Sequence, residues 1–519
     1  MRPTLRSAAV PALAALLAWT PAAAQRPVPA PSGSPDRGWT LPAAPASAPI
    51  PREEFAARRR ALAEHMSDGV RVVMGSDESG ASYQAFAQTP DFRYLTGLTE
   101  PSAMLVMSRR GAEVTEHLFV APRDPSREVW EGARLGAEGA ARLTGIPAHG
   151  ADESDGVLDD LLRDVTTLYT LTPERGRGFQ STEQQYIAML RREHASIRRV
   201  LDLSSALLDL RKTKTPAELD MLRRAVYITV LAQREAMRAV EPGMNEFEVH
   251  ALIEGTFRRY GAERPGFGSI VGSGPNATTL HYRRADRFMQ DGEVVVMDIG
   301  ASFNGYAADV TRTVPVNGRF SPEQRAVYEI VLAAQKAAEE QARPGVTLGR
   351  LNQTATRVIA DGLTRLGLIE GAQATYDCRR GEATATCPQV GMFYMHGLGH
   401  GIGLDVHDPD AAYSGGLVNG SAFTIEPGIY VRADALDYLP DTPRNRQLIA
   451  RLRPALERYR NIGVRIEDDY FVTGGRVERV TAGAPREIAE IEALMAMESF
   501  WNRERRPEMV EWYRGITPR

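Results

Sequence analysis

The stretch Val294–Pro315, VVVMDIGASFNGYAADVTRTVP, decides the fold of this chain. It opens with a β-branched run that ends at Asp298 and closes with a second strand-like run that carries Asp309. Between the two runs lie Asn304 and Gly305, which both tolerate the positive φ of a two-residue hairpin turn. The stretch therefore predicts a β-hairpin with one acidic residue on each strand.

The register of this hairpin brings the two acidic residues to one face. With this turn, Phe303 pairs with Tyr306 and Asp298 pairs with Thr311. Asp309 is then the diagonal neighbour of Asp298 on the same face. Two carboxylates on one face repel each other unless a cation lies between them. A solvated acidic hairpin would also fit, but both acids lie inside apolar runs, so we predict half of a metal site.

Composition sets broad limits on the class of protein. The 519 residues are enough for two or more domains, and 43% hydrophobic with 25% charged residues is ordinary for a globular protein. The net charge of -4 gives no indication of nucleic acid as a partner.

Residues 1–24 are predicted to be a signal peptide. Arg2 and Arg6 precede an apolar stretch, and the small residues that follow it suit cleavage after residue 24. A membrane anchor is the alternative, but the apolar run is short and broken by Pro11. No later segment is long and apolar enough for stable membrane insertion. Residues 25–50, rich in Pro, Ala and Ser, are predicted to be a flexible linker.

We therefore expect an exported protein, periplasmic or secreted. Cys378 and Cys387 are its two cysteines, and in an oxidising compartment they can close a small loop. We expect a disulfide with a structural role, because neither cysteine lies beside a plausible base. The segment Tyr376–Gln389 that holds them and the charged stretch Ala435–Arg460 are predicted to be entrance or interface elements.

A first domain is predicted over residues 51–205. Strands that alternate with helices indicate an α/β layer structure, followed by a connection at Ser205–Lys214. Helices are expected at Glu53–Met66 and Glu183–His194, and strands at Val70–Met74, Phe92–Leu95, Ala103–Met107 and Glu116–Val120. Four histidines of this domain are isolated in the sequence and suit surface or core roles: His65, His117, His149 and His194.

The second domain, predicted over residues 206–500 with a tail at 501–519, contains a duplicated helix–helix–strand unit. The stretches TPAE (215–218) and SPEQ (321–324) are both capping boxes that open long helices. A further helix follows each of them, opening at Asn245 and at Thr347, so the copies are offset by 102 to 106 residues. The alternative is chance recurrence of common capping residues, but chance would have to place all four helix starts in register. The duplication predicts a site at the pseudo-symmetric interface of the two halves.

A glycine-rich stretch, Phe393–Asp408, carries three of the nine histidines. His396 and His400 are four residues apart, but the glycines between them and beyond argue against a helix. The stretch also lacks the glutamate of an HExxH motif, which argues against a zincin helix. An extended, glycine-thinned segment instead lets a substrate or another backbone come close.

Two more carboxylates lie in apolar strands further along. Glu426 follows the run Phe423–Ile425, and Glu467 lies in a strand expected at Ile462–Val472, where it shares a face with Arg465. Four carboxylates and one imidazole carry more negative charge than one divalent ion needs, so we expect two cations with bridging carboxylates. The oxygen-rich set favours manganese, while cobalt and zinc are chemically allowed. The predicted metal ligands are Asp298, Asp309, His400, Glu426 and Glu467.

The order of these motifs resembles that of the Xaa-Pro aminopeptidases (aminopeptidase P), dinuclear metallopeptidases of family M24 with the pita-bread fold. The resemblance rests on DIG (298–300), DVTRT (309–313), HGLGHGIGLDVHD (396–408), TIEPG (424–428) and RIED (465–468), and in the first domain on FRYLTGLTEP (92–101) and EVWEGARLG (128–136). It implies an α+β protein. An N-terminal α/β creatinase-like domain would be followed by a pita-bread catalytic domain with internal pseudo-two-fold duplication.

The resemblance implies a role for each metal ligand. Asp298 would bind one metal ion, Asp309 and Glu467 would bridge two ions, and His400 and Glu426 would complete the second site. Glu426 would also accept a proton from the attacking water.

Four other residues match catalytic positions of the family. His281 would lie near the substrate amine and the scissile bond, and His407 would hydrogen-bond the tetrahedral intermediate. His396 and Arg465 would lie next to the metal ligands without binding metal themselves.

The implied activity is release of the N-terminal residue from peptides with proline in the second position, by attack of a metal-bridging hydroxide. A prolidase, which cleaves Xaa-Pro dipeptides, would share all five ligands, but the match in the first domain favours the aminopeptidase. A metal-free pita-bread binding protein or a creatinase-type hydrolase would have lost ligands. Expected partners are peptide substrates and further copies of the chain, in a homodimer or homotetramer in which the Trp130 region reaches a neighbour's site.

Overall fold

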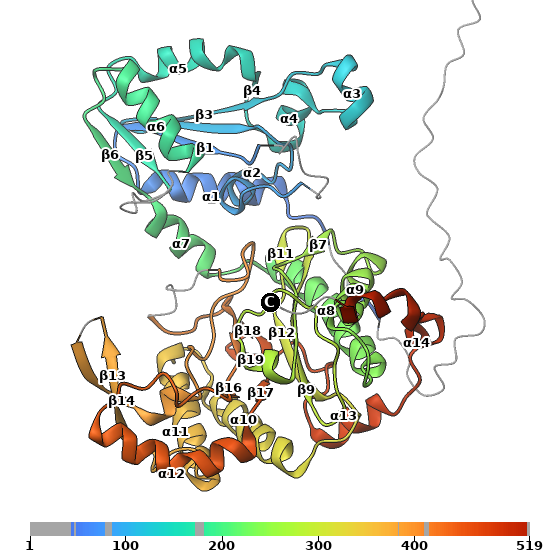
Figure 1. Ribbon diagram of the computed structural model, residues 1–519. Helices are drawn as coiled ribbons and strands as arrows, with labels where there is room; N and C mark the ends of the chain where they lie inside the picture. The colour runs from blue at the N-terminus through green and yellow to red at the C-terminus, as the bar shows by residue number, and fades with distance from the viewer. Residues whose placement is uncertain are drawn as a thin grey trace, which may run out of the picture. The chain divides into compact units, whose positions relative to one another are not determined.

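The computed structural model describes residues 43–45, 48–77, 86–171, 181–381, 383–408 and 415–515 (Figure 1). The chain divides into two compact units, Met1–Ala44 and Pro45–Arg519, and every helix and strand below belongs to the second. The expected signal peptide lies outside the described residues, as does most of the expected linker. No helix within the described ranges has the length and apolar character that crossing a bilayer requires.

The first part of this unit is a mixed six-stranded sheet with helices on both faces. The strand order is β4-β3-β2-β1-β5-β6, in which β1, β2 and β3 pair antiparallel and the other neighbours pair parallel. The strands are β1 (Gly69–Met74), β2 (Met104–Arg110), β3 (Glu113–Val120), β4 (Ala148–Gly150), β5 (Thr167–Thr170) and β6 (Arg199–Asp202). The helices are α1 (Arg52–Glu64), α2 (Pro90–Thr96), α3 (Pro125–Glu131), α4 (Gly136–Thr144), α5 (Ser154–Leu162), α6 (Thr182–Glu193) and α7 (Ser204–Lys212).

Alternation along β1 assigns its apolar side chains to two cores. Val70 and Val72 pack with buried residues of α5 and α6, whereas Val73 packs with buried residues of α1, α2 and α4. A strand with a period of two and apolar residues on both faces is typical of a sheet covered on both sides. The predicted α/β layer structure of this domain is confirmed.

Two local predictions in this region are wrong. Phe92–Leu95 lies in α2, because Pro90 occupies the first helical turn and Gly97 ends the helix with φ 70°. The expected connection after residue 204 is helix α7, where Asp202 accepts hydrogen bonds from the backbone N–H and hydroxyl of Ser204.

Two of the histidines that are isolated in the sequence contact each other in the structure. His117 lies on β3 and His149 on β4, and the pairing of these strands brings their ring nitrogens to 3.1 Å. Burial and the neighbouring His149 lower the pKa of His117. The two histidines are 32 residues apart in the sequence and meet only because β3 pairs with β4. Neither residue's local sequence predicts this contact.

The second part contains the two predicted helix pairs. The first pair is α8 (Pro216–Ala239) and α9 (Glu246–Arg259), and the second is α10 (Pro322–Gln341) and α11 (Leu348–Leu366). Thr215, Asn245 and Ser321 each complete a capping box, and the Thr347 side chain accepts a bond from the backbone of Arg350. All four predicted helix starts are confirmed.

Short antiparallel sheets lie beside these helices (Figure 1). They are arranged as β12-β9-β8, β11-β10-β7, β15-β18-β19 and β16-β17. The strands are β7 (Arg264–Pro265), β8 (Ile270–Ser273), β9 (Val294–Ile299), β10 (Ala301–Phe303), β11 (Tyr306–Ala307), β12 (Val310–Pro315), β15 (Ala422–Ile425), β16 (Gly428–Val431), β17 (Ile462–Arg465), β18 (Asp468–Thr473) and β19 (Arg476–Arg479). Most of their residues are buried, so these sheets form the core of the second part of the chain.

The predicted register of the hairpin is confirmed. Phe303 pairs with Tyr306, and Asp298 pairs with Thr311. Gly300 lies where the two strands approach most closely, since a Cβ atom there would meet the carbonyl oxygen of Ala308 at 1.8 Å. Only glycine fits this point, which holds the two acid-bearing strands together.

The strand expected at Ile462–Val472 is divided into β17 and β18. The backbone N–H of Ile466 donates to Pro427 O at 3.4 Å, and that of Glu467 donates to Thr311 O at 3.0 Å. The chain thus changes partners at this point, from β16 to β15. Glu467 lies in the break between the two strands. Its side chain therefore need not follow the alternation of side chains between the two faces of a continuous strand.

A buried glutamine on α8 fixes the two acid-bearing strands of the first half. The Gln233 amide donates to the carbonyl oxygens of Met297 and Val310, both at 2.8 Å. These carbonyls belong to the residues next to Asp298 and Asp309. The Gln233 side chain is fully buried, so the amide has no competing solvent.

An equivalent glutamine on α10 repeats these contacts 102 positions further along the chain. The Gln335 amide donates to the carbonyl oxygens of Ile425 and Ile466, both at 3.1 Å. These residues precede Glu426 and Glu467. The internal duplication therefore extends to the hydrogen bonds that hold the carboxylates of each half.

A fully buried ion pair joins the two halves. Arg312 of β12 donates to the carboxylate of Asp468 on β18 at 2.6 Å and to the carbonyl oxygen of Glu467 at 2.6 Å. Both charged side chains are 0% exposed, and loss of either would leave the other charge buried.

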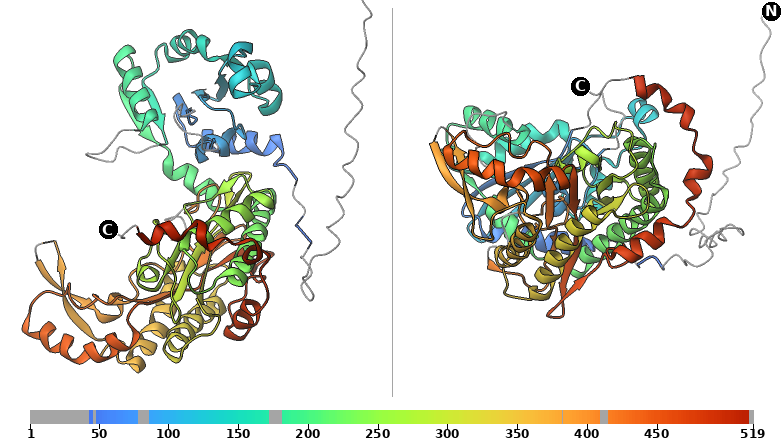
Figure 2. Two further views of the ribbon diagram at one scale, coloured as in Figure 1. Left: turned by 45° about the vertical axis from the view of Figure 1, so that its right-hand side comes forward. Right: turned by 60° about the horizontal axis from the view of Figure 1, so that its bottom comes forward.

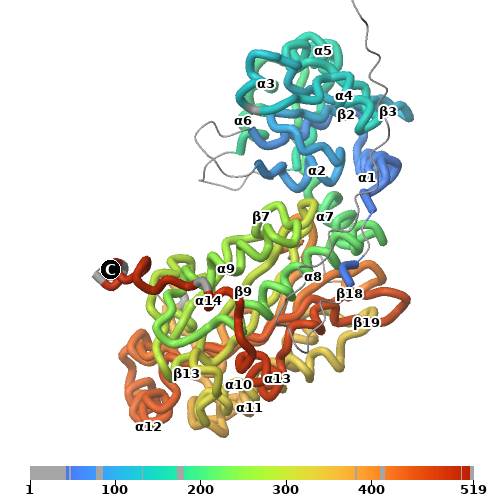
Figure 3. The backbone as a smooth tube through the Cα atoms, turned by 90° about the vertical axis from the view of Figure 1, so that its right-hand side faces the viewer, coloured from blue at the N-terminus to red at the C-terminus, as the bar shows by residue number. Residues whose placement is uncertain are grey.

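A disulfide and a C-terminal segment complete this part. Cys378 and Cys387 are bonded across the hairpin β13 (Thr375–Arg380) and β14 (Ala383–Pro388), which confirms the predicted pair. Figure 2 shows this hairpin beside α12 (Pro443–Tyr459). Helices α13 (Ile488–Met495) and α14 (Phe500–Glu504) follow β19, and Figure 3 shows α14 near α9. Arg505, just after α14, forms an ion pair with Glu248 of α9 at 2.8 Å.

We predict that Gln233→Met and Gln335→Met each lower the free energy of unfolding by about 2 kcal/mol, because each removes two buried hydrogen bonds to backbone carbonyls. Chemical denaturation measures both. Arg223→Met is the control: it removes an exposed pair with Glu478, which should be worth less than about 1 kcal/mol. Glutamine variants as stable as the control would contradict the role assigned to the two amides.

Candidate metal centre

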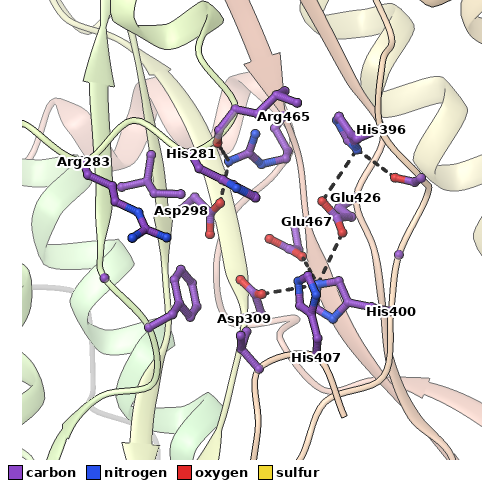
Figure 4. A pocket seen from close by; sticks show the side chains of 17 residues that line it. His281, Arg283, Asp298, Asp309, His396, His400, His407, Glu426, Arg465 and Glu467 are labelled. Carbon is purple, nitrogen blue, oxygen red and sulfur yellow. Dashed lines mark hydrogen bonds and ion pairs between the residues drawn. The ribbon is translucent and has the colours of Figure 1, made fainter. Parts of the chain in front are cut away.

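One cavity of about 460 Å³ collects the predicted site residues (Figure 4). A volume in this range suits a small ligand. All nine predicted site residues line it: His281, Asp298, Asp309, His396, His400, His407, Glu426, Arg465 and Glu467.

The floor of the cavity is buried and acidic. Asp298, Asp309, His400 and Glu467 are each at most 7% exposed, and Glu426 is half-buried. Each half of the duplicated domain contributes two of the four carboxylates. The predicted interface of the two halves is therefore where the candidate ligands meet.

His400 faces three of these carboxylates. Its Nε2 atom lies 3.5 Å from Asp309 Oδ2, 3.4 Å from Glu426 Oε1 and 4.0 Å from Glu467 Oε1. Its Nδ1 atom lies 3.0 Å from the carbonyl oxygen of Gly401, which can only accept, so Nδ1 carries the proton. In the neutral ring the Nε2 lone pair then points at oxygen acceptors, an arrangement that a cation between them would satisfy.

Burial and the charges of neighbouring carboxylates raise the pKa of two of the acidic residues. The pKa of Asp309 is raised well above its usual value, first by burial and then by the charges of Glu467 and Asp298. Burial, with the charge of Asp298, likewise raises the pKa of Glu467 to about 7. Both shifts mean that the ionised cluster lacks positive charge.

The unsatisfied oxygen atoms fit a metal site. Asp298 Oδ1, Asp309 Oδ1 and Glu467 Oε1 are buried and have no hydrogen-bond partner among the described residues. Buried polar atoms are seldom left unpaired. Asp309, His400 and Glu467 also offer ligand atoms that all lie within 4.8 Å of one another. Carboxylate oxygen with one imidazole is a donor set for hard or borderline divalent ions.

Arg465 holds one side of the cluster. It donates to Asp298 Oδ2 through a short hydrogen bond, to the Tyr430 hydroxyl at 2.8 Å and to Thr311 Oγ1 at 3.3 Å. Thr311 in turn donates to Glu467 at 2.6 Å. The arginine therefore orients a carboxylate from each half and supplies one positive charge.

His396 is held neutral beside this network. Its Nδ1 atom donates to the carbonyl oxygen of Gly397 at 2.7 Å, so its Nε2 atom accepts from the Tyr430 hydroxyl at 2.8 Å. Burial, with the charge of Arg465, lowers the pKa of His396 to about 4. A neutral imidazole at physiological pH suits a positioning role better than proton transfer.

Two buried cationic side chains hold the loop that carries His400 and His407. Lys214 donates to the carbonyl oxygen of Asp408 at 2.8 Å, and Arg211 of α7 lies 2.9 Å from its carboxylate. The rings of His400 and His407 are 4.0 Å apart, so this anchor also fixes the orientation of His407. His281 and His407 are exposed, at the open side of the cavity.

Sequence reasoning missed two residues of the cavity and its support. Tyr430 joins His396 to Arg465 but lies in an ordinary apolar strand, with no signal beyond its position after the EPG turn. Arg283 lines the cavity two residues after His281. Its basic, turn-rich sequence context reads as a surface loop, so no local pattern singles it out.

Comparisons with known proteins agree with this site. A family model described as metallopeptidase family M24 matches residues 220–474, and one described as aminopeptidase P, N-terminal domain, matches residues 55–169. The Xaa-Pro aminopeptidase of Haemophilus influenzae is 35% identical over 457 residues, covering 86% of this chain and 98% of that protein. The Escherichia coli Xaa-Pro aminopeptidase is 34% identical over 459 residues, with the same coverage.

Solved structures give the same result. The low-pH form of E. coli aminopeptidase P superposes with a TM-score of 0.72 and 32% identity, covering 86% of this chain and 99% of that one. The superposition thus includes residues of both parts of the chain described above. On this fold, this cavity and these similarities, the chain belongs to metallopeptidase family M24, as a member of its aminopeptidase P group.

Proposed function

We propose that this protein is a dinuclear metal-dependent aminopeptidase that releases the N-terminal residue of peptides with proline in the second position. The observation that carries the proposal is the buried set of four carboxylates around His400, with unsatisfied oxygen atoms on Asp298, Asp309 and Glu467. The similarity to Xaa-Pro aminopeptidases over both domains supports the substrate class.

Five residues would hold the two ions. Asp298 would bind one ion, Asp309 and Glu467 would bridge both, and His400 and Glu426 would complete the second site. When bound, divalent ions lower the pKa of a water shared between them, so that it can attack at neutral pH. The predominance of carboxylate oxygen favours manganese, with cobalt and zinc as alternatives.

The residues around this cluster would divide the remaining chemistry. Glu426 is half-buried, with one oxygen toward His400, and would accept the proton of the attacking water. His407, exposed beside His400, would donate to the oxyanion that develops on the scissile carbonyl. His281, at the open side, would position the substrate near its amine and scissile bond.

The cavity also suits a proline in the second position. A prolyl nitrogen has no hydrogen, so the site need not provide an acceptor at that point. Apolar side chains of Phe267, Ile270, Leu280 and Val406 line the cavity and can contact a rigid pyrrolidine ring.

We also propose export to the periplasm or the medium, with residues 1–24 as signal peptide and 25–50 as linker. The Cys378–Cys387 disulfide supports this, because disulfides persist in oxidising compartments. Domains are proposed at 51–205 and 206–500, with a tail at 501–519. We propose a homodimer or homotetramer in which the exposed region of Trp130, 88% accessible on α3, reaches a neighbouring subunit.

A prolidase is the closest alternative, and a non-catalytic pita-bread binding protein is a more distant one. The match of residues 55–169 to the aminopeptidase P N-terminal domain favours the aminopeptidase over the prolidase. The presence of every candidate ligand in one cavity favours an enzyme over a binding protein.

We predict that the manganese-loaded protein releases alanine from Ala-Pro-Pro-Ala and that Asp309→Ala abolishes this release. Chromatography of the products with wild type and variant is the measurement. Cleavage of Ala-Pro alone would identify a prolidase instead. Absence of cleavage of either peptide, with metal bound, would contradict the proposed substrate class.

The raised pKa of Glu467 predicts how stability depends on pH. Between its ordinary pKa and about 7 the folded state binds the proton that the unfolded state has lost. The contribution of Glu467 to the stability of the metal-free protein should therefore be largest below its ordinary pKa and should fall by on the order of 3 kcal/mol as pH rises to about 7. Thermal unfolding between about pH 5 and 8 measures this.

Two comparisons sharpen this test. Glu467→Gln should flatten the pH dependence of the metal-free protein. Added manganese should reverse it, because ligands must lose protons to bind metal. A metal-free wild type that gains stability as pH rises would be inconsistent with the buried, mutually repelling carboxylates.

A further inference from the structure

One cation in the cavity has no role in holding the metal cluster. Arg465 and Arg283 are the arginines that line the cavity within the described ranges. Arg465 is bonded to Asp298 and Tyr430. Arg283 is exposed, and its guanidinium has no hydrogen-bond or ion-pair partner among the described residues. Figure 4 shows its side chain entering the cavity from the side of His281, across from His400.

The local backbone explains why Arg283 faces the cavity. Its two neighbours are held on the other side. Tyr282 lies with its hydroxyl 3.0 Å from Glu246 and 3.1 Å from Asp286, and Arg284 forms an ion pair with Asp286 at 2.7 Å. Because alternate residues are anchored away from the cavity, His281 and Arg283 both face into it.

The chemistry of Arg283 selects an anionic ligand. A guanidinium is always charged, and its planar donors match a carboxylate in a bidentate arrangement. The acidic floor of the cavity is assigned to metal ions. A bound substrate can bring such an anion into the cavity.

Spacing places this anion beyond the scissile bond. Residues two apart in an extended segment are about 6–7 Å apart. An extended peptide substrate covers the same distance in at most two residues. The cationic amine of a substrate would be repelled by Arg283, so with His281 near the scissile bond the arginine meets the peptide one or two residues on the leaving side. In a tripeptide, this is where the C-terminal carboxylate lies.

We propose that Arg283 binds the C-terminal carboxylate of short peptides, so that the preferred substrates are tripeptides of the form Xaa-Pro-Xaa with a free carboxylate. The proposal rests on the proposed function. It adds the preferred substrate length and identifies Arg283 as the residue that selects it. A cavity of about 460 Å³ is consistent with a peptide of this size.

The test compares Ala-Pro-Ala as the free acid and as the C-terminal amide. For wild type, kcat/KM should be about 10-fold higher for the acid, the size of one charge-assisted hydrogen bond at a partly exposed site. In Arg283→Gln this preference should disappear, because the group that distinguishes the acid from the amide is removed. Arg283→Lys should restore part of the preference.

Arg284→Gln is the matched control. It removes the same charge one residue further along, from a side chain that pairs with Asp286 outside the cavity lining. It should keep the wild-type preference for the acid. Loss of the preference in this control but not in Arg283→Gln would overturn the assignment.

Other outcomes would also overturn the proposal. These are equal kcat/KM values for the acid and the amide with wild type, or an unchanged preference in Arg283→Gln. A preference for amidated Ala-Pro-Asp over amidated Ala-Pro-Ala, lost in Arg283→Gln, would assign the arginine to an acidic side chain instead.

A binding measurement separates this proposal from the proposed function. Calorimetry with the leaving peptide Pro-Ala, as acid and as amide, requires no turnover. Tighter binding of the acid by wild type but not by Arg283→Gln would support the carboxylate site even if no peptide were cleaved. Equal binding of the two forms by wild type would exclude the site.

Discussion

Mutual repulsion among buried carboxylates is the constraint on which the rest of this structure depends. The fold gathers Asp298, Asp309, Glu426 and Glu467 around one imidazole, and burial raises the pKa of Asp309 and of Glu467. Ionised carboxylates at such a site cost free energy unless positive charge compensates them. Arg465 supplies one charge. Divalent ions would compensate the remaining negative charge.

The duplicated architecture is what can hold such a cluster rigid. Each half fixes its two carboxylates through one buried glutamine, Gln233 or Gln335, bonded to the adjacent carbonyls. The ion pair between Arg312 and Asp468 then joins the halves. Catalytic groups must be positioned to within a fraction of an ångström, so rigid backbone support of this kind serves function as well as stability.

Local signals in the sequence predict much of this fold, and long-range contacts decide the rest. The turn at Asn304-Gly305 fixes the hairpin register because turn chemistry and alternation act over a few residues. The position of Glu467 in a strand break depends instead on backbone bonds to segments some 40 and 156 residues away in sequence, including one to Thr311. Tyr430 joins the site through tertiary contacts alone, and no local pattern identifies it.

The most direct test of this account is the number of metal ions per chain. The protein would be loaded with manganese, freed of excess ions and analysed by elemental mass spectrometry beside Asp309→Asn. We predict two manganese ions per wild-type chain, and fewer in the variant, because one carboxylate that bridges the ions is removed. A fully active wild type that holds one ion or none would contradict the dinuclear site.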